Sequence, residues 1–182
     1  MKRRNIKADQ FTPMSSDCIM FDTNIMIDLF YPVNFSRRTN PYEKVYMDIR
    51  KKGSRLIISS VQISEFINKC IRIRFDLYNV NNDKNFKKDY RNTDDYKNNM
   101  NAILEIINHD IIPNFVFIDD GFTEMQNEKI FRYGASYDFN DALIAEIAKK
   151  NNAYLVTQDG DFFNYSSEIT LVTENKALLM MA

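Results

Sequence analysis

Five short, mostly apolar runs recur along the chain. Continuous apolar runs of this length are typical of strands that are buried on both faces of a parallel sheet. They predict strands at residues 17–21, 56–59, 115–118, 153–157 and 169–172.

Apolar residues with helical spacing separate these runs. They predict helices over 41–52, 60–75 and 141–150. Because strand and helix alternate, we expect an α/β fold, a three-layer sandwich around a central, mainly parallel sheet of about five strands. Residues 76–95 are polar and charged, and helical spacing resumes from Tyr96 to Ile107. We therefore expect an added helical insertion at about 76–112.

The length of 182 residues suits one domain with a single core. We expect that domain to span residues 1–182, with its core at about 17–175. Hydrophobic residues make up 45% and charged residues 27%, which are ordinary values for a folded globular protein.

The composition limits the chemistry that the chain can perform. One histidine, His109, and two cysteines, Cys18 and Cys70, are too few for a tetrahedral zinc site or a disulfide framework. Four scattered glycines form neither a dinucleotide fingerprint nor a Walker loop. Any metal ion must therefore be bound by oxygen. We expect the two thiols to lie in the core and His109 to lie at the end of a helix.

Charge and hydropathy bear on location and partners. The formal net charge is −1, so no overall basic field indicates a nucleic-acid partner. The basic N-terminus lacks a following apolar segment, and no stretch is long and apolar enough for a membrane span, so we expect a cytoplasmic protein without membrane contact. One local run combines Lys87, Lys88 and Arg91 with Phe86 and Tyr90. It predicts RNA binding through phosphate contacts and base stacking, although such a run is also typical of a plain solvated face.

Acidic residues follow several predicted strands. Asp22 comes directly after the first, and Asp159 and Asp161 follow the fourth. Glu65 lies early in the helix after the second, and Asp138 and Asp141 open a later helix. The carboxyl ends of parallel strands share one edge of the sheet, where ligands bind. We therefore expect these acids, which come from four separate segments, to converge.

Taken singly, each acid could be a helix cap or a turn residue. Asp22 fits that alternative least, because it directly follows an apolar strand where an isolated charge is costly. Converging carboxylates repel one another, so at least one should have a raised pKa, and a cation should sit among them. Oxygen ligands favour Mg²⁺ or Mn²⁺.

Four motifs in order, FDTN (21–24), SEF (64–66), DALIAEIA (141–148) and LVTQDGDF (155–162), resemble the PIN domain (PilT N-terminal domain) family, including the VapC-type toxin ribonucleases. The resemblance runs from about residue 17 to 163. It implies Asp22, Glu65, Asp141 and Asp159 as the catalytic, metal-binding quartet. It also implies Thr23, Asn24 and Thr157 as assisting polar residues, with Asp138 and Asp161 as second-choice ligands.

The resemblance implies a Mg²⁺- or Mn²⁺-dependent endoribonuclease that leaves 3′-hydroxyl and 5′-phosphate ends. Because His109 is poorly placed to act as a base, we expect metal-activated water to attack the phosphodiester. Whether one ion or two is bound stays open, with Glu65 either holding a second ion or orienting water. RNA is the expected substrate, and an antitoxin protein and a homodimer are the partners to consider.

Two other functions remain as alternatives. A PIN-like scaffold could bind RNA or protein without cutting. A Mg²⁺-dependent phosphohydrolase of the haloacid dehalogenase type also has an acid after its first strand, but it needs a second acid where this chain has Asn24.

Overall fold

The computed structural model describes residues 5–32, 40–125, 139–165 and 168–180. Its centre is a six-stranded sheet in the order β1-β6-β5-β2-β3-β4, in which every neighbouring pair is parallel. The strands are β1 (Ile6–Lys7), β2 (Cys18–Phe21), β3 (Arg55–Ser59), β4 (Val116–Ile118), β5 (Tyr154–Val156) and β6 (Thr170–Thr173). The five strands predicted from sequence are confirmed. The two-residue β1 is additional, because it is too short to produce an apolar run.

Alternate residues of the central strands build two separate cores. Ile19 and Phe21 of β2 pack with Leu56 and Ile58 of β3 in one cluster, whereas Met20 packs on the opposite face. Side chains of a strand point alternately to its two faces, so both faces need a helical cover. The three-layer α/β sandwich is therefore confirmed.

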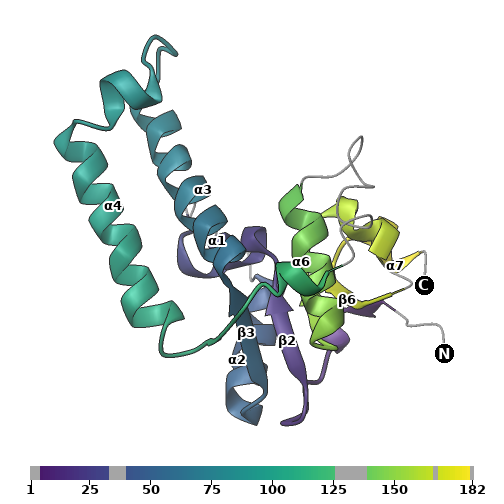
Figure 1. The fold of residues 1–182 in the computed structure, drawn as a ribbon. Coiled ribbons are helices and arrows are strands. Elements are labelled where there is room, and N and C mark those ends of the chain that lie inside the picture. The colour runs from purple at the N-terminus through teal and green to yellow at the C-terminus, as the bar shows by residue number, and fades with distance from the viewer. Residues whose placement is uncertain (1–4, 33–39, 126–138, 166–167, 181–182) are drawn as a thin grey trace.

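Helices before β4 cover the first face, and later helices cover the second (Figure 1). The first group contains α1 (Thr23–Phe30), α2 (Pro41–Lys52) and α3 (Ser60–Tyr78), and α4 (Asp94–Ile106) packs mainly on α3. The second contains α6 (Phe139–Lys150) and α7 (Lys176–Leu179). The sequence patterns missed α1 and α7, which are short. None of the helices in the described segments is long and apolar enough to cross a membrane.

Local signals account for the helix ends. The Asn40 side chain accepts a hydrogen bond from the Tyr42 N–H, Pro41 occupies the first turn of α2, and Gly53 closes that helix at φ 67°. Ser59 and Gln62 form a capping box at the start of α3. Because α3 starts where β3 ends, its first turns lie at the carboxyl edge of the sheet.

α3 and α4 lie side by side as a helical hairpin that projects from the sheet (Figure 1). We call residues 79–93, which join the two helices, the hairpin tip. The tip contains a π-helical turn, Phe86–Tyr90, whose two aromatic rings pack against Phe75 of α3 and Tyr96 of α4. The segment expected as a polar loop thus has an aromatic core of its own.

Candidate metal centre

Among the described residues, five carboxylates gather near the carboxyl ends of β2 and β5, and we call them the acidic edge: Asp22, Glu65, Asp141, Asp159 and Asp161. Asp22 directly follows β2, and Asp159 and Asp161 come shortly after β5. Glu65 lies in the second turn of α3, and Asp141 lies in the first turn of α6. The topology brings these residues, far apart in sequence, to one edge of the sheet.

Asp22 is held rigidly between β2 and β5. Asp22 is only 1% exposed. Its backbone N–H donates to the Val156 carbonyl at 2.9 Å, and the Thr157 hydroxyl donates to its Oδ2, also at 2.9 Å. The same Thr157 oxygen accepts from the Asp159 N–H at 2.9 Å. Thr157 therefore fixes Asp22 and the start of the Asp159 loop relative to each other.

The pKa of Asp22 is raised to about 6, chiefly because burial disfavours the charged carboxylate. The Thr157 hydrogen bond and the Lys69 charge lower this pKa, while the charges of Asp159 and Glu65 raise it further. A raised carboxyl pKa was predicted from the sequence and is confirmed. The prediction named repulsion as the cause, whereas the larger cause is burial.

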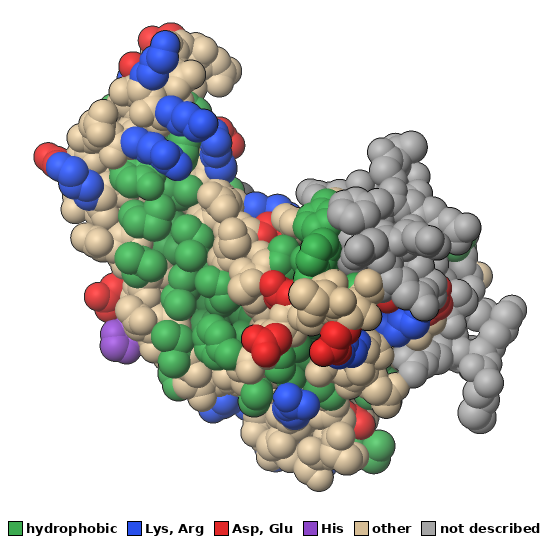
Figure 2. Space-filling model, in the orientation of Figure 1, with side chains coloured by type: hydrophobic (Ala, Val, Ile, Leu, Met, Phe, Trp, Pro, Cys, Tyr) green, Lys and Arg blue, Asp and Glu red, His purple; other side chains and the backbone are tan. Residues whose placement is uncertain are grey.

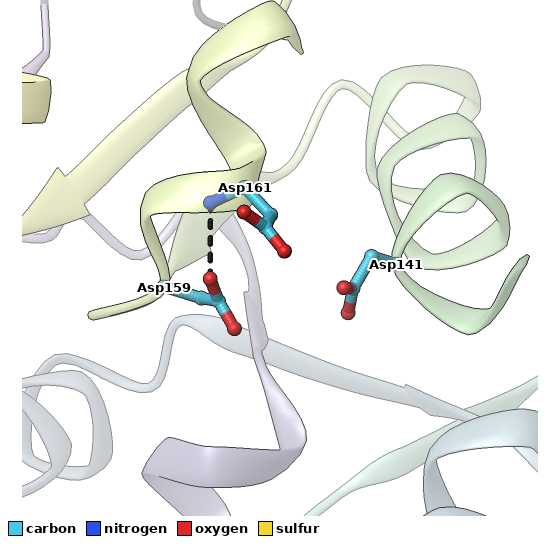
Figure 3. A group of neighbouring side chains, drawn as sticks. All are labelled: Asp141, Asp159 and Asp161. Carbon is cyan, nitrogen blue, oxygen red and sulfur yellow. Dashed lines mark hydrogen bonds between the residues drawn. The ribbon is translucent and has the colours of Figure 1, made fainter. Parts of the chain in front are cut away.

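Asp141, Asp159 and Asp161 form the open part of the acidic edge (Figure 3). Each offers one carboxylate oxygen, and these three oxygens lie within 4.8 Å of one another. The Asp161 N–H donates to Asp159 Oδ1 at 2.9 Å, which orients that carboxylate. Asp141 and Asp159 are half-buried and Asp161 is exposed. Three oxygen ligands from two segments fit a divalent ion such as Mg²⁺ or Mn²⁺, which binds carboxylates and retains water.

Glu65 lies in the buried part of the acidic edge and is 8% exposed. Its Oε2 accepts from the Thr23 hydroxyl at 2.9 Å, and its Oε1 lies 2.7 Å from Lys69 Nζ. Lys69 Nζ also donates to Asn24 Oδ1 at 3.0 Å. Burial lowers the pKa of Lys69, but the bond to Glu65 and the charges of Glu65, Asp22 and Asp141 outweigh this, so the pKa is raised. Lys69 is therefore a fixed cation among the acids.

A groove of about 650 Å³ runs from this edge between α1, α3 and the start of α6. Its lining includes Asn24 of α1, Asn140 of α6, and Glu65, Lys69 and Arg72 of α3. The groove therefore connects Glu65 and Lys69 with the solvent along α3.

The structure brings together most of the residues predicted for the site. Asp22, Glu65, Asp141 and Asp159 all lie at the acidic edge, and Thr23, Asn24 and Thr157 contact them or Lys69. Asp161, a second choice, lies directly with Asp141 and Asp159. Asp138, the other second choice, lies outside the described residues. Sequence reasoning missed Lys69, although its i, i+4 spacing from Glu65 is a recognised signal for a helical ion pair.

The predicted base-stacking role of Phe86 and Tyr90 is wrong. These residues are 8% and 0% exposed, so their rings serve the packing between α3 and α4. Lys87, Lys88 and Arg91 are exposed at the hairpin tip, as their charge requires. Figure 2 shows Lys and Arg side chains gathered near this end of the hairpin. His109 is exposed and pairs with Glu105 at 3.1 Å.

Comparison with known proteins gives one family and several structures. Residues 19–168 match the model of the PIN domain. VapBC2 from Rickettsia felis, solved with a DNA fragment from their promoter, is similar at 20% identity and a TM-score of 0.53, covering 86% of this chain and 98% of that chain. FitAcB from Neisseria gonorrhoeae is similar at 14% identity and a TM-score of 0.50, covering 85% and 96%. No relative was found among the curated proteins.

Proposed function

The chain belongs to the PIN domain family, and we propose that it is a metal-dependent endoribonuclease. The observation that carries the proposal is the convergence of Asp141, Asp159 and Asp161 beside the buried Asp22. Carboxylates gathered in this way repel one another unless a cation lies among them. A bound cation would offset this repulsion, and the carboxylates would be its ligands.

The residues of the acidic edge have different roles in this proposal. Asp141, Asp159 and Asp161 would hold a Mg²⁺ or Mn²⁺ ion, with Asp22 positioned next to them through Thr157. Such an ion lowers the pKa of a bound water and neutralises charge on a phosphodiester. The Asp161 N–H orients the Asp159 carboxylate, and Thr157 holds the backbone N–H of Asp159. This preorganisation means that the ligands need little rearrangement when an ion binds.

RNA binding needs cations, which the acidic edge largely lacks. We propose that Lys87, Lys88 and Arg91 contact phosphates of an extended RNA. Between Glu65 and Tyr78, α3 rises by ~20 Å, so the hairpin tip is several nucleotides away from the acids. Figure 2 supports this arrangement, because the basic side chains gather at the end of the hairpin.

An antitoxin is the protein partner that we propose. The support is the resemblance to VapC-type toxins and the likeness of fold to VapBC2, which was solved with DNA from their promoter. Co-purification of this chain with the product of a neighbouring open reading frame, and inhibition of cleavage by that product, would test the pairing. The homodimer stays a prediction.

The test of the function is cleavage of single-stranded RNA with Mn²⁺, with and without EDTA. Asp159→Asn should lower the rate by more than ~100-fold, since even outer-shell partners of a metal are worth 10–100-fold. Asp110→Asn, at an exposed aspartate beside His109, is the matched control and should cleave normally. Cleavage that resists EDTA and survives Asp159→Asn would overturn the proposal. Absence of Mn²⁺ binding by calorimetry would favour the scaffold, and turnover of a phosphomonoester would favour the phosphohydrolase.

A further inference from the structure

Glu65 has a different environment from the three open aspartates. Both of its carboxylate oxygens are engaged within the chain, Oε2 by the Thr23 hydroxyl and Oε1 by Lys69 Nζ. A divalent ion at Glu65 would have to displace an ammonium at 2.7 Å from a carboxylate that is 8% exposed. Charge-assisted bonds of this length are the strong ones, and removing the ammonium would leave a nearly buried carboxylate without its charge partner.

Lys69 occupies the position that a second cation would need. Its ammonium contacts Glu65 and Asn24, which come from α3 and α1, so two helices fix its position. An ammonium has three donors, and these two contacts account for two of them. The Lys69 side chain is 40% exposed and lines the groove that leads to the acidic edge. A phosphate in the groove can therefore reach it.

We propose that Lys69 takes the place of a second divalent ion at Glu65, so that the site holds one ion and the ammonium contacts the scissile phosphate. This inference rests on the proposed nuclease function. Glu65 is then a positioning residue for Lys69 rather than a metal ligand. Positive charge would then come from the ion at the three aspartates and from Lys69 beside Glu65. Both would stabilise the negative charge that develops on the phosphate.

The first test counts ions without measuring activity. Calorimetry of the full chain with Mn²⁺ should give one ion per chain. Glu65→Gln should keep that ion with an affinity changed by less than a few-fold, whereas Asp159→Asn should lose it. Two ions per chain, or loss of binding in Glu65→Gln, would overturn the inference and leave the nuclease proposal standing. No binding and no cleavage by the wild type would overturn both.

The second test separates the charge of Lys69 from its structural contribution. Lys69→Met should bind Mn²⁺ at least as tightly as the wild type, because a like charge is removed, and should cleave RNA about 10²-fold more slowly under single-turnover conditions. Lys69→Arg should restore part of the rate. Lys44→Met is the matched control, since Lys44 also forms an i, i+4 pair at 2.7 Å, with Asp48 on α2. A normal rate in Lys69→Met, or weakened Mn²⁺ binding, would overturn the inference.

Discussion

The acidic edge and the hairpin tip are both rich in charged residues, but they differ in which side chains are buried. At the acidic edge two of the charged groups are buried, Asp22 and Glu65, which are 1% and 8% exposed. At the tip the aromatic rings are inside, and Lys87, Lys88 and Arg91 remain in solvent. Burying rings stabilises the fold, whereas burying carboxylates opposes it. We therefore expect substitutions in the two regions to affect stability with opposite signs.

The largest effect should come from the aromatic core of the tip. Tyr90 is 0% exposed, and its ring centroid lies 5.0–5.8 Å from those of Tyr78, Phe75, Tyr96 and Phe86. Tyr90→Ala should lower the free energy of unfolding by ~3–5 kcal/mol, measured by urea titration. Tyr90→Phe, which removes only the hydrogen bond to Asp95, should cost about 1 kcal/mol. Equal losses in the two variants would contradict a core role for the ring.

Asp22→Asn should change the free energy of unfolding in the opposite direction and stabilise the protein. The folded-state pKa of Asp22, about 6, lies above its unfolded value of ~4, so the folded protein binds the proton more tightly. The metal-free wild type should gain stability as pH falls through 6, and the gain should level off below 4. At pH 7 Asp22→Asn should therefore raise the free energy of unfolding by roughly 2–3 kcal/mol, with little difference at pH 4.

Urea titrations in EDTA at both pH values check this prediction, and Asp110→Asn is the control for removal of an exposed charge. Asp22 makes no side-chain capping bond to α1, so the substitution removes no cap. Cleavage should disappear as stability rises. A less stable Asp22→Asn at pH 7 would show that the carboxylate is stabilising, and the contrast between the two regions would fail.

The exposed cations of the tip should affect stability least. The triple variant Lys87→Ala, Lys88→Ala, Arg91→Ala should change the free energy of unfolding by under about 1 kcal/mol, mainly through the Arg91 guanidinium, which lies 5.5 Å from the Phe86 ring centroid. RNA binding should weaken, and the slope of log affinity against log salt should fall by up to ~0.7 for each RNA phosphate that the variant no longer neutralises.

A Lys51→Ala, Lys52→Ala variant is the control, because these exposed lysines end α2 at the opposite edge of the sheet. It should leave the slope unchanged. An unchanged slope in the triple variant would assign Lys87, Lys88 and Arg91 to an ordinary solvated face.

The sequence alone determined the order of the main strands and helices and the edge at which the acids meet. Apolar runs mark buried strands because both faces of a parallel sheet exclude water. The residue after such a strand must then lie at the carboxyl edge, whatever surrounds it. Asp22 and Asp159 could be placed there for this reason, and Glu65 and Asp141 because they lie near the starts of helices. The choice of these four among the acids at the edge came from the resemblance to the PIN domain.

Only the tertiary structure decided the directions and partners of the side chains. Asp161 joins Asp141 and Asp159 because the turn after β5 folds back on Asp159. Lys69 becomes part of the site because α1 packs against α3 and brings Asn24 to its ammonium. Phe86 and Tyr90 are buried because α4 returns along α3, and no local pattern records that return. Periodicity specifies which face of a segment is apolar, but contacts between segments decide which neighbour covers it.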